Sequence, residues 1–414
     1  MSIHIPQRIL VAPSGFKESL GADAVAAAIA AGIRRVIPGV QVDEYPVPDG
    51  GEGTAEVLAA TTGGELVPAV VTGPVGRPEA AHWARLGGAA RGTAVVEMAA
   101  AAGLRLVPRD QRDPGATTTA GVGELIAAAL DDGATRVIVG CGDSGTSDGG
   151  AGALRALGVR ILDADGAELP DGGAHLARAA RIDLSGLHPR AREAEIVLAC
   201  NTHNVLCGPR GVARVFGPQK GASPAQVEEL SAALEHWAEL LARTMPALPL
   251  APGGAPAPEL DLRTGPGTGA SGGLGAGLAA VLGARLAPRF EVLLDPSVAP
   301  VCLDALIAEA DLVITAEGAI DFQTPRGKVP AEIALRARTA GVPVLGIAGS
   351  LGAGAPDVHD IGIGAIASIL TVPMELEQAV DQGEALLRDA AERSMRMILL
   401  GSALSARGAQ QLAA

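Results

Sequence analysis

The fold of this chain is indicated most clearly by residues 9–47, ILVAPSGFKESLGADAVAAAIAAGIRRVIPGVQVDEYPV. The apolar run 9–12 predicts a buried strand, and the alanine-rich stretch that stops at Pro38-Gly39 predicts a helix. A second strand is expected at residues 40–47. This β-α-β order places the intervening loop, with Pro13 and Gly15, at the carboxyl end of the first strand, where open α/β sheets bind ligands.

The far end of the chain repeats this alternation of strands and helices. Strands are predicted at 311–315, 342–348 and 365–370, and helices at 330–340 and about 375–399. Similar units at both ends predict one parallel sheet built from the two termini. We therefore expect an α/β fold in which a Rossmann-like parallel-sheet domain, residues 1–71 and 293–414, is interrupted by a second mixed-sheet α/β domain, residues 72–292.

The central stretch differs from the two ends. Short alternating runs predict antiparallel or mixed strands at 65–71, 79–85 and 93–98, and further strands are expected at 136–140 and 195–199. The length of 414 residues supports two domains, because a single hydrophobic core stops growing well below that size. Only 2% of the residues are aromatic, so the core has to be built from Ala, Val, Leu and Ile.

Charge and hydropathy exclude several classes of partner. A net charge of -14 disfavours nucleic acid and anionic membrane surfaces, which require a basic face. No run approaches the ~18 apolar residues of a membrane span, and the first residues lack the regions of a signal peptide. The four cysteines show no spacing typical of a disulfide scaffold or a cysteine zinc site. We expect a cytoplasmic protein with a small-molecule partner.

The rarity of lysine singles out three positions. Lys17, Lys220 and Lys328 are the three lysines among 32 basic residues. All three stand beside Gly, Pro or aromatic residues in segments expected to be loops. A compact ammonium meets a phosphate oxygen as a point charge, which a planar guanidinium does not. The alternative is that these are exposed lysines left by chance.

A glycine-rich segment, PGTGASGGLGAG at residues 266–277, precedes an expected helix that ends near Leu282. Its glycines could present backbone N–H groups to a phosphate. The segment contains G-x-G-x-x-G, but no clear strand precedes it, so a dinucleotide fingerprint and an NAD(P)-dependent oxidoreductase are the weaker interpretation. A flexible loop is the other alternative. The candidate cofactor-binding residues are Gly267, Gly269, Ser271, Gly272 and Gly273, together with Lys328.

Two further segments place acidic and hydroxyl groups after strands. The sequence GCGDSGTSDGGAG, residues 140–152, carries Asp143, Ser144, Thr146 and Asp148, which suit a hydroxylated ligand or a metal, although a helix-capping loop is the alternative. The sequence PDGGEGT, residues 48–54, carries Asp49 and Glu52, which could hold Mg²⁺ or accept a hydroxyl proton.

The last two segments add carboxylates, cations and a histidine. Residues 314–330 contain Glu317 and Asp321 after a buried-looking strand, with Lys328 before a helix. Residues 199–222 contain Asn201, His203, Asn204, Arg210 and Lys220. A histidine with no visible partner is more often structural than a general base, and we interpret His203 in that way.

Taken together, these segments resemble the type I glycerate kinase family, which is related to the bacterial glycerate 2-kinases. The resemblance rests on six motifs in one order along nearly the whole chain. They are APSGFKESL, PVPDGGEGT, GTSDGGAG, CGPRGVARVFGPQKGA, PGTGASGGLGAG and DLVITAEGAIDFQT followed by Gly327-Lys328. The resemblance implies ATP, Mg²⁺ and D-glycerate, with 2-phosphoglycerate as product, and a site in the cleft between two domains.

Roles for individual residues follow from these motifs and from the resemblance. The expected catalytic residues are Lys17, Asp49, Glu52, Asp148 and Lys220. The expected substrate-binding residues are Ser14, Ser144, Asn204 and Arg210. The metal is expected on Glu317 or Asp321, because both should follow a parallel strand at its ligand-binding end.

Several positions depart from the family pattern. Ser14 and Asn201 stand where Asp is common, Asp143 stands where Gly is common, and Ala319 and Phe322 stand where Arg and Gly are common. These departures leave the identity of the hydroxy acid open. The alternatives are a kinase of another small hydroxy acid and a non-catalytic sugar-acid or nucleotide-binding protein of the same fold.

Overall fold

A computed structural model gives the fold of the chain, and residues 5–16, 19–244 and 260–412 are described. The chain divides into two compact units. Residues 1–47 and 301–414 form the terminal unit, and residues 48–300 form the central unit. Both ends of the chain therefore enter one unit, and the other unit is inserted between them.

The unit boundaries lie at Pro48 and Val301, whereas the sequence predicts them at residues 72 and 293. Helix α2 (Thr54–Thr62) packs on the central sheet, and strand β3 (Glu65–Thr72) pairs along its whole length with β4 (Pro78–Arg85). Helix α9 (Arg289–Leu293) packs on the same sheet. These contacts place residues 48–71 and 293–300 in the central unit.

The terminal unit contains a five-stranded sheet in which every neighbouring pair is parallel. In spatial order its strands are β13 (Ile363–Ser368), β12 (Val344–Leu351), β11 (Leu312–Ile320), β1 (Arg8–Val11) and β2 (Gln41–Glu44). The strand order reverses between β1 and β11. Such a reversal marks the ligand-binding crevice of open α/β sheets, at the carboxyl ends of the strands.

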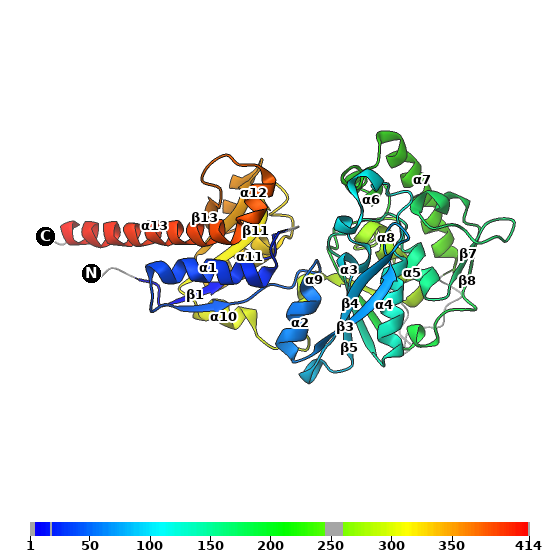
Figure 1. Ribbon diagram of the computed structural model, residues 1–414, viewed down its shortest axis with the longest axis horizontal. Helices are drawn as coiled ribbons and strands as arrows, with labels where there is room; N and C mark the ends of the chain where they lie inside the picture. Colours follow the sequence, from blue (N-terminus) through cyan, green and yellow to red (C-terminus); the bar gives the residue numbers. More distant parts are fainter. Residues whose placement is uncertain (1–4, 17–18, 245–259, 413–414) are drawn as a thin grey trace. The chain divides into compact units, whose positions relative to one another are not determined.

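Helices cover both faces of this sheet. Helices α1 (Ala22–Val36) and α13 (Gly383–Leu412) lie side by side over one face, and α10 (Leu303–Glu309) and α11 (Val329–Ala340) pack on the other (Figure 1). Gly32 permits the close approach of α1 and α13, because a β-carbon there would lie 2.2 Å from the Arg388 carbonyl oxygen. The single helix predicted at 375–399 is instead two, since α12 (Leu376–Asp381) ends before α13 begins.

The central unit contains a mixed six-stranded sheet. In spatial order its strands are β10 (Arg285–Pro288), β9 (Glu195–Cys200), β6 (Arg136–Gly140), β5 (Thr93–Glu97), β4 and β3. The first four are parallel, and β4 and β3 complete the sheet as antiparallel strands. A separate antiparallel pair consists of β7 (Arg160–Leu162) and β8 (Arg181–Asp183).

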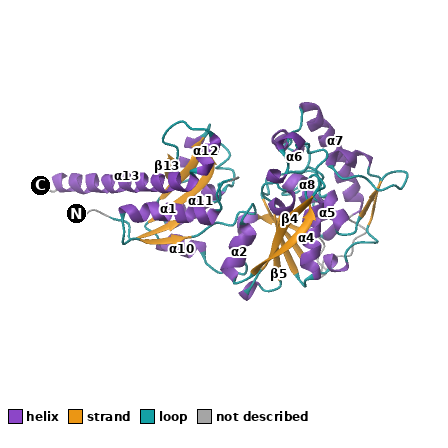
Figure 2. Ribbon diagram, in the orientation of Figure 1, coloured by secondary structure: helices purple, strands orange, loops and turns teal. Residues whose placement is uncertain are grey.

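Helices also cover the central sheet on both faces. Helices α2 and α9 pack on one face around Leu58, Ile138 and Leu293. The other face is covered by α3 (Met98–Ala102), α4 (Ala120–Asp131), α5 (Ala151–Ala156), α6 (Val212–Phe216), α7 (Pro224–Thr244) and α8 (Ala270–Leu282). Figure 2 shows α2 and the pair α4 and α5 on opposite sides of β4 and β5.

These two sheets confirm the predicted fold class, a Rossmann-like parallel-sheet unit made from both chain ends and interrupted by a mixed-sheet α/β unit. The cores consist mainly of Ala, Val, Leu and Ile, and both tryptophans, Trp83 and Trp237, are fully buried. Among the described residues, no helix has the length and hydropathy needed to cross a bilayer.

Candidate functional site

Four of the segments singled out in the sequence meet in the central unit, at the carboxyl ends of β6 and β9. The Gly142 N–H donates to the Gly50 carbonyl at 2.8 Å, which joins the loop after β6 to the PDGGEGT loop. Ser271 Oγ donates to the Cys141 carbonyl at 3.0 Å. The Gly269 N–H donates to the Asn204 carbonyl at 3.1 Å. The fold thus brings together residues that are up to about 220 positions apart in sequence.

Asp148 organises the loop after β6 from the inside. Its side chain is wholly buried, and its carboxylate accepts hydrogen bonds of 2.8 Å from both the N–H and the hydroxyl of Thr119. The N–H groups of Gly150 and Gly152 donate to it at 3.1 Å. Burial raises the pKa of Asp148, and these hydrogen bonds oppose the shift. Asp148 therefore caps the starts of α4 and α5. Its contacts are those of a helix-capping loop, which was the alternative to a ligand or metal site for this segment.

Lys220 is also buried, with 2% of its surface exposed. Its ammonium donates to Ser144 Oγ at 2.9 Å and to the Thr146 carbonyl at 2.5 Å. Burial lowers the pKa of Lys220 to about 7, and the charge of Asp148 acts in the opposite direction. The lysine expected in an open loop therefore points inward and holds the Ser144 loop from behind.

The glycine-rich segment packs against other loops of the central unit. The N–H groups of Gly267, Gly269 and Gly273 donate to the carbonyls of Thr202, Asn204 and Gly269. A β-carbon at Gly272 would lie 2.1 Å from the Thr146 carbonyl oxygen. These glycines therefore permit close contact between backbones. Three of the N–H groups that were expected to bind a phosphate already donate to backbone carbonyls.

The dinucleotide fingerprint receives no support from this arrangement. Helix α8 contains a break at residues 271–273, where Ser271 adopts a φ of 51° and the next two glycines also have positive φ. In the described part of the chain between β9 and α8, there is no β-strand beyond an isolated bridge between Val205 and Gly211. The motif therefore does not lie between a strand and a helix as a dinucleotide-binding loop requires.

The PDGGEGT loop places two carboxylates in accessible positions. A β-carbon at Gly51 would lie 2.7 Å from Asp143 Oδ2 and 3.1 Å from Asp49 Oδ1, so both carboxylates converge on this glycine. Arg289 Nη1 lies 4.0 Å from Asp49 Oδ2 and donates to the Asp49 carbonyl at 3.1 Å. Glu52 is more exposed and forms an ion pair of 3.1 Å with Arg105.

The expected substrate-binding residues of the central unit have different environments. Ser144 is half-buried and accepts the hydrogen bond from Lys220. Asn204 is half-buried beside the glycine-rich segment, and Arg210 is exposed just before α6. His203 has a local partner, because its Nδ1 lies 3.1 Å from Asn201 Oδ1, which agrees with the structural interpretation of this histidine.

In the terminal unit, carboxylates and a lysine gather at the point where the strand order reverses. Lys328 Nζ lies 3.0 Å from Glu317 Oε1 and 3.6 Å from Asp321 Oδ1. Ser14 follows β1, and its N–H and hydroxyl both donate to the Ala316 carbonyl, at 3.0 and 3.2 Å. One detail of the sequence analysis was wrong: β11 continues to Ile320, so Glu317 lies within the strand and pairs with Ala348.

The chemistry of these side chains fits a hard divalent cation. Around Lys328 Nζ lie two carboxylates and the Ala319 carbonyl at 3.5 Å, and the Thr324 hydroxyl donates to Glu317 Oε2 at 3.4 Å. Oxygen donors of these kinds suit Mg²⁺. The ammonium of Lys328 supplies one positive charge to the cluster and partly offsets the repulsion between the two carboxylates.

Two other cations were expected near the site, Lys17 and Arg326. Lys17 lies outside the described residues. Arg326 places its guanidinium 5.6 Å from the centre of the Phe322 ring. Sequence reasoning missed Thr119, Arg289 and Thr324, which contact the expected site residues. A run of three threonines before α4 is the one signal that could have indicated Thr119.

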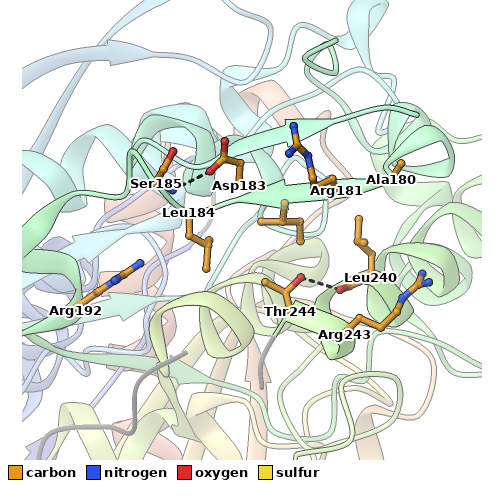
Figure 3. A pocket seen from close by; sticks show the side chains of 10 residues that line it. Ala180, Arg181, Asp183, Leu184, Ser185, Arg192, Leu240, Arg243 and Thr244 are labelled. Carbon is orange, nitrogen blue, oxygen red and sulfur yellow. Dashed lines mark hydrogen bonds between the residues drawn. The ribbon is translucent and has the colours of Figure 1, made fainter. Parts of the chain in front are cut away.

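A hollow of about 690 Å³ lies elsewhere in the central unit (Figure 3). Its walls are β8 with the following turn and the carboxyl end of α7, and it is lined by Arg181, Arg192 and Arg243 among others. None of the expected site residues lines it. The candidate site is defined by the loops at the strand ends and not by this hollow.

Comparison with known proteins identifies the family. A profile of the glycerate kinase family matches residues 9–399. A glycerate kinase of Bacillus subtilis (strain 168) is 43% identical over 388 residues, 93% of this chain and 97% of that protein. A glycerate 2-kinase of Escherichia coli (strain K12) is 44% identical over 372 residues, 90% and 93% of the two chains.

A solved structure agrees with these relatives. The crystal structure of a protein assigned as glycerate kinase 2 from Salmonella typhimurium LT2 is 41% identical, with a TM-score of 0.74, and the match covers 96% of this chain and 99% of that one. The family profile and these relatives place the chain among small-molecule kinases. The chain belongs to the glycerate kinase family, which confirms the resemblance found in its motifs.

The buried ammonium of Lys220 should make the stability of the protein depend on pH. The folded chain releases this proton near pH 7, whereas the unfolded chain keeps it to about pH 10. Between these values the unfolded state binds more protons, so Lys220 should make stability rise with pH, by on the order of 1 kcal/mol per pH unit. Urea unfolding of the wild type and of Lys220→Met at several pH values measures the difference in slope.

Lys328→Met serves as the control for this measurement. The ammonium of Lys328 is partly exposed and paired with carboxylates. Lys328→Met still contains Lys220, so its stability should rise with pH as steeply as that of the wild type. Equal slopes for the wild type and Lys220→Met would show that Lys220 does not lose its proton near neutral pH in the folded chain.

Proposed function

We propose that this chain transfers the γ-phosphoryl group of ATP to D-glycerate and releases ADP and 2-phosphoglycerate. The observation that carries the proposal is the family match across residues 9–399, with relatives named glycerate kinase and glycerate 2-kinase at 43–44% identity. The proposal then assigns roles to the two clusters of polar residues according to their exposure and contacts.

The reaction sets the groups that the protein must supply. A hydroxyl oxygen of glycerate forms a bond to the γ-phosphorus, and the bond from that phosphorus to the bridging oxygen of ADP breaks. The hydroxyl proton has to leave, and negative charge on the phosphates has to be balanced. The protein therefore needs a proton acceptor, cations for the phosphates and donors for the carboxylate of glycerate.

We assign the phosphate end to the terminal unit. Glu317 and Asp321 would hold Mg²⁺, and Lys328 would then turn its ammonium toward a phosphate oxygen. When bound, Mg²⁺ neutralises charge on the phosphates. Lys17 stays an expected phosphate contact on sequence grounds. Ser14 is almost fully buried, and its hydrogen bonds to Ala316 support a role in fixing the loop after β1.

We assign the proton acceptor to Asp49 rather than Glu52. Both carboxylates lie in the PDGGEGT loop, but Glu52 is paired with Arg105 at 3.1 Å. Asp49 converges with Asp143 on Gly51, and Arg289 Nη1 lies 4.0 Å from Asp49 Oδ2. A general base must reach the hydroxyl proton of the substrate, and the close ion pair with Arg105 holds the Glu52 carboxylate away from that task. The role of Glu52 is then to position the loop.

We assign the glycerate carboxylate to the neighbouring donors of the central unit. Ser144, Asn204 and Arg210 are the expected residues that are at least partly exposed there. Lys220 and Asp148 are buried behind Ser144, so we treat them as positioning residues. Ser271 and the glycines 267, 269, 272 and 273 support the same loops, and their expected role as a phosphate cradle is replaced in this proposal by packing.

Replacing the proton acceptor should abolish most of the activity. Asp49→Asn removes the base while keeping size and the hydrogen bond from Gly51, so kcat for D-glycerate should fall by on the order of 10²- to 10⁴-fold. Glu52→Gln, in the same loop, should cost less than about 10-fold. ADP release measured with saturating ATP gives both values. Similar losses in the two variants would contradict the assignment of Asp49.

Replacing the metal carboxylates should change the response to Mg²⁺. Glu317→Gln and Asp321→Asn should each raise the Mg²⁺ concentration for half-maximal rate by about 10-fold or more, because each removes one charged ligand. Glu332→Gln is the matched control, since Glu332 lies in the same unit and pairs with Arg336. An unchanged Mg²⁺ response in both site variants would place the metal elsewhere.

A further inference from the structure

A histidine and two glutamates lie together in the central unit, apart from every residue assigned above. Glu56 lies on α2, His82 on β4 and Glu97 at the end of β5. One ligand atom from each falls within 4.8 Å of the other two. We infer that these three residues form a binding site for a divalent transition metal, with Zn²⁺ as the best-fitting ion.

The three side chains come from three elements that the fold holds in place. β4 and β5 are neighbours in the sheet, and α2 packs on both of them. Glu97 is 1% exposed, and one of its oxygens accepts a hydrogen bond of 2.6 Å from the Ala55 N–H in the first turn of α2. Its carboxylate is therefore fixed in position, and the site needs little ordering to bind an ion.

Two potential ligand atoms are buried without a hydrogen bond. These are Glu56 Oε2 and His82 Nε2, neither of which has an aligned partner. His82 Nε2 lies 3.0 Å from Glu56 Oε1 as an ion pair, and this contact raises the pKa of His82 and lowers that of Glu56. Buried polar atoms are normally satisfied, so the buried Glu56 Oε2, which has no hydrogen bond, indicates a missing partner beside this ion pair.

The charges around the cluster also favour a cation. Two carboxylates converge there, and Arg105, the nearby cation, is engaged with Glu52 at 3.1 Å. Burial and the charge of Glu56 raise the pKa of Glu97 to about 8, so a bound divalent ion would replace the Glu97 proton and balance both glutamates. The cluster differs in this respect from His188 and Asp131, which form a simple pair of 3.0 Å.

The donor types select the ion. Imidazole nitrogen with carboxylate oxygens is a ligand set used for Zn²⁺, whereas Mg²⁺ prefers oxygen donors alone. Ligand atoms around tetrahedral zinc are about 3.5 Å apart. The ligand atoms lie within 4.8 Å of one another, and the Glu56 side chain, which is 43% exposed, can adjust its position toward an ion.

A metal here would strengthen the base of the PDGGEGT loop. Glu97 accepts a hydrogen bond from the first turn of α2, to which Glu56 belongs, and this helix begins directly after that loop. The ion would link α2 to β4 and β5 and so fix the position of the PDGGEGT loop, which precedes α2. This inference does not rest on the proposed function, because metal binding can be measured without turnover.

The test is the binding of Zn²⁺ by the full chain in the presence of excess Mg²⁺. Equilibrium dialysis followed by metal analysis should find one tightly bound Zn²⁺ per wild-type chain, with a rise in Tm on zinc addition. His82→Gln should weaken this binding by on the order of 100-fold and remove the Tm rise. His82 lies on the half-exposed side of β4, so this variant should fold.

His188→Gln is the matched control, because it removes a histidine–carboxylate pair that lacks a third ligand. It should bind zinc as the wild type does. Glu97→Gln, which can still accept the bond from Ala55, should behave like His82→Gln and provides a second variant. Absence of tight zinc binding in the wild type, or equal binding by His82→Gln, would overturn the inference.

Discussion

The candidate site depends on one buried carboxylate. Asp148 accepts four hydrogen bonds from Thr119, Gly150 and Gly152, and in doing so fixes the starts of α4 and α5. Removing it would leave several buried donors unsatisfied, each at a cost of about 1–3 kcal/mol. The loop after β6 can then pack against the glycine-rich segment only because glycines stand where backbones meet. The roles proposed for the central unit depend on this support.

The roles proposed for the polar side chains follow from whether each side chain is buried or accessible. Lys220 and Asp148 lie behind the loop that carries Ser144, whereas Asp49 lies on a loop that can meet a ligand. The backbone at Asp143 has a φ of 55°, a left-handed conformation that glycine adopts most easily. This explains why the family pattern has Gly at that position, and why Asp, which tolerates this conformation, can replace it.

Much of the fold could be predicted from the sequence, and the strand at Arg136–Gly140 was placed at its observed bounds. Strand β10 was missed because it has four residues and carries Arg and Pro at its ends. The motifs that carry the family resemblance could be found because each has a distinctive composition. Composition does not show where an N–H or an ammonium points, so the glycines and Lys220 were expected to face a ligand. The cluster of Glu56, His82 and Glu97 forms only through tertiary packing and has no sequence signal.

The central claim is that this protein phosphorylates glycerate at the expense of ATP. Phosphorus-31 NMR of a reaction with ATP, Mg²⁺ and D-glycerate observes both the donor and the product. The account predicts that the γ-phosphate signal of ATP is replaced by that of a phosphomonoester with the shift and proton coupling of 2-phosphoglycerate. An unchanged ATP spectrum with glycerate, from a folded protein, would contradict the account.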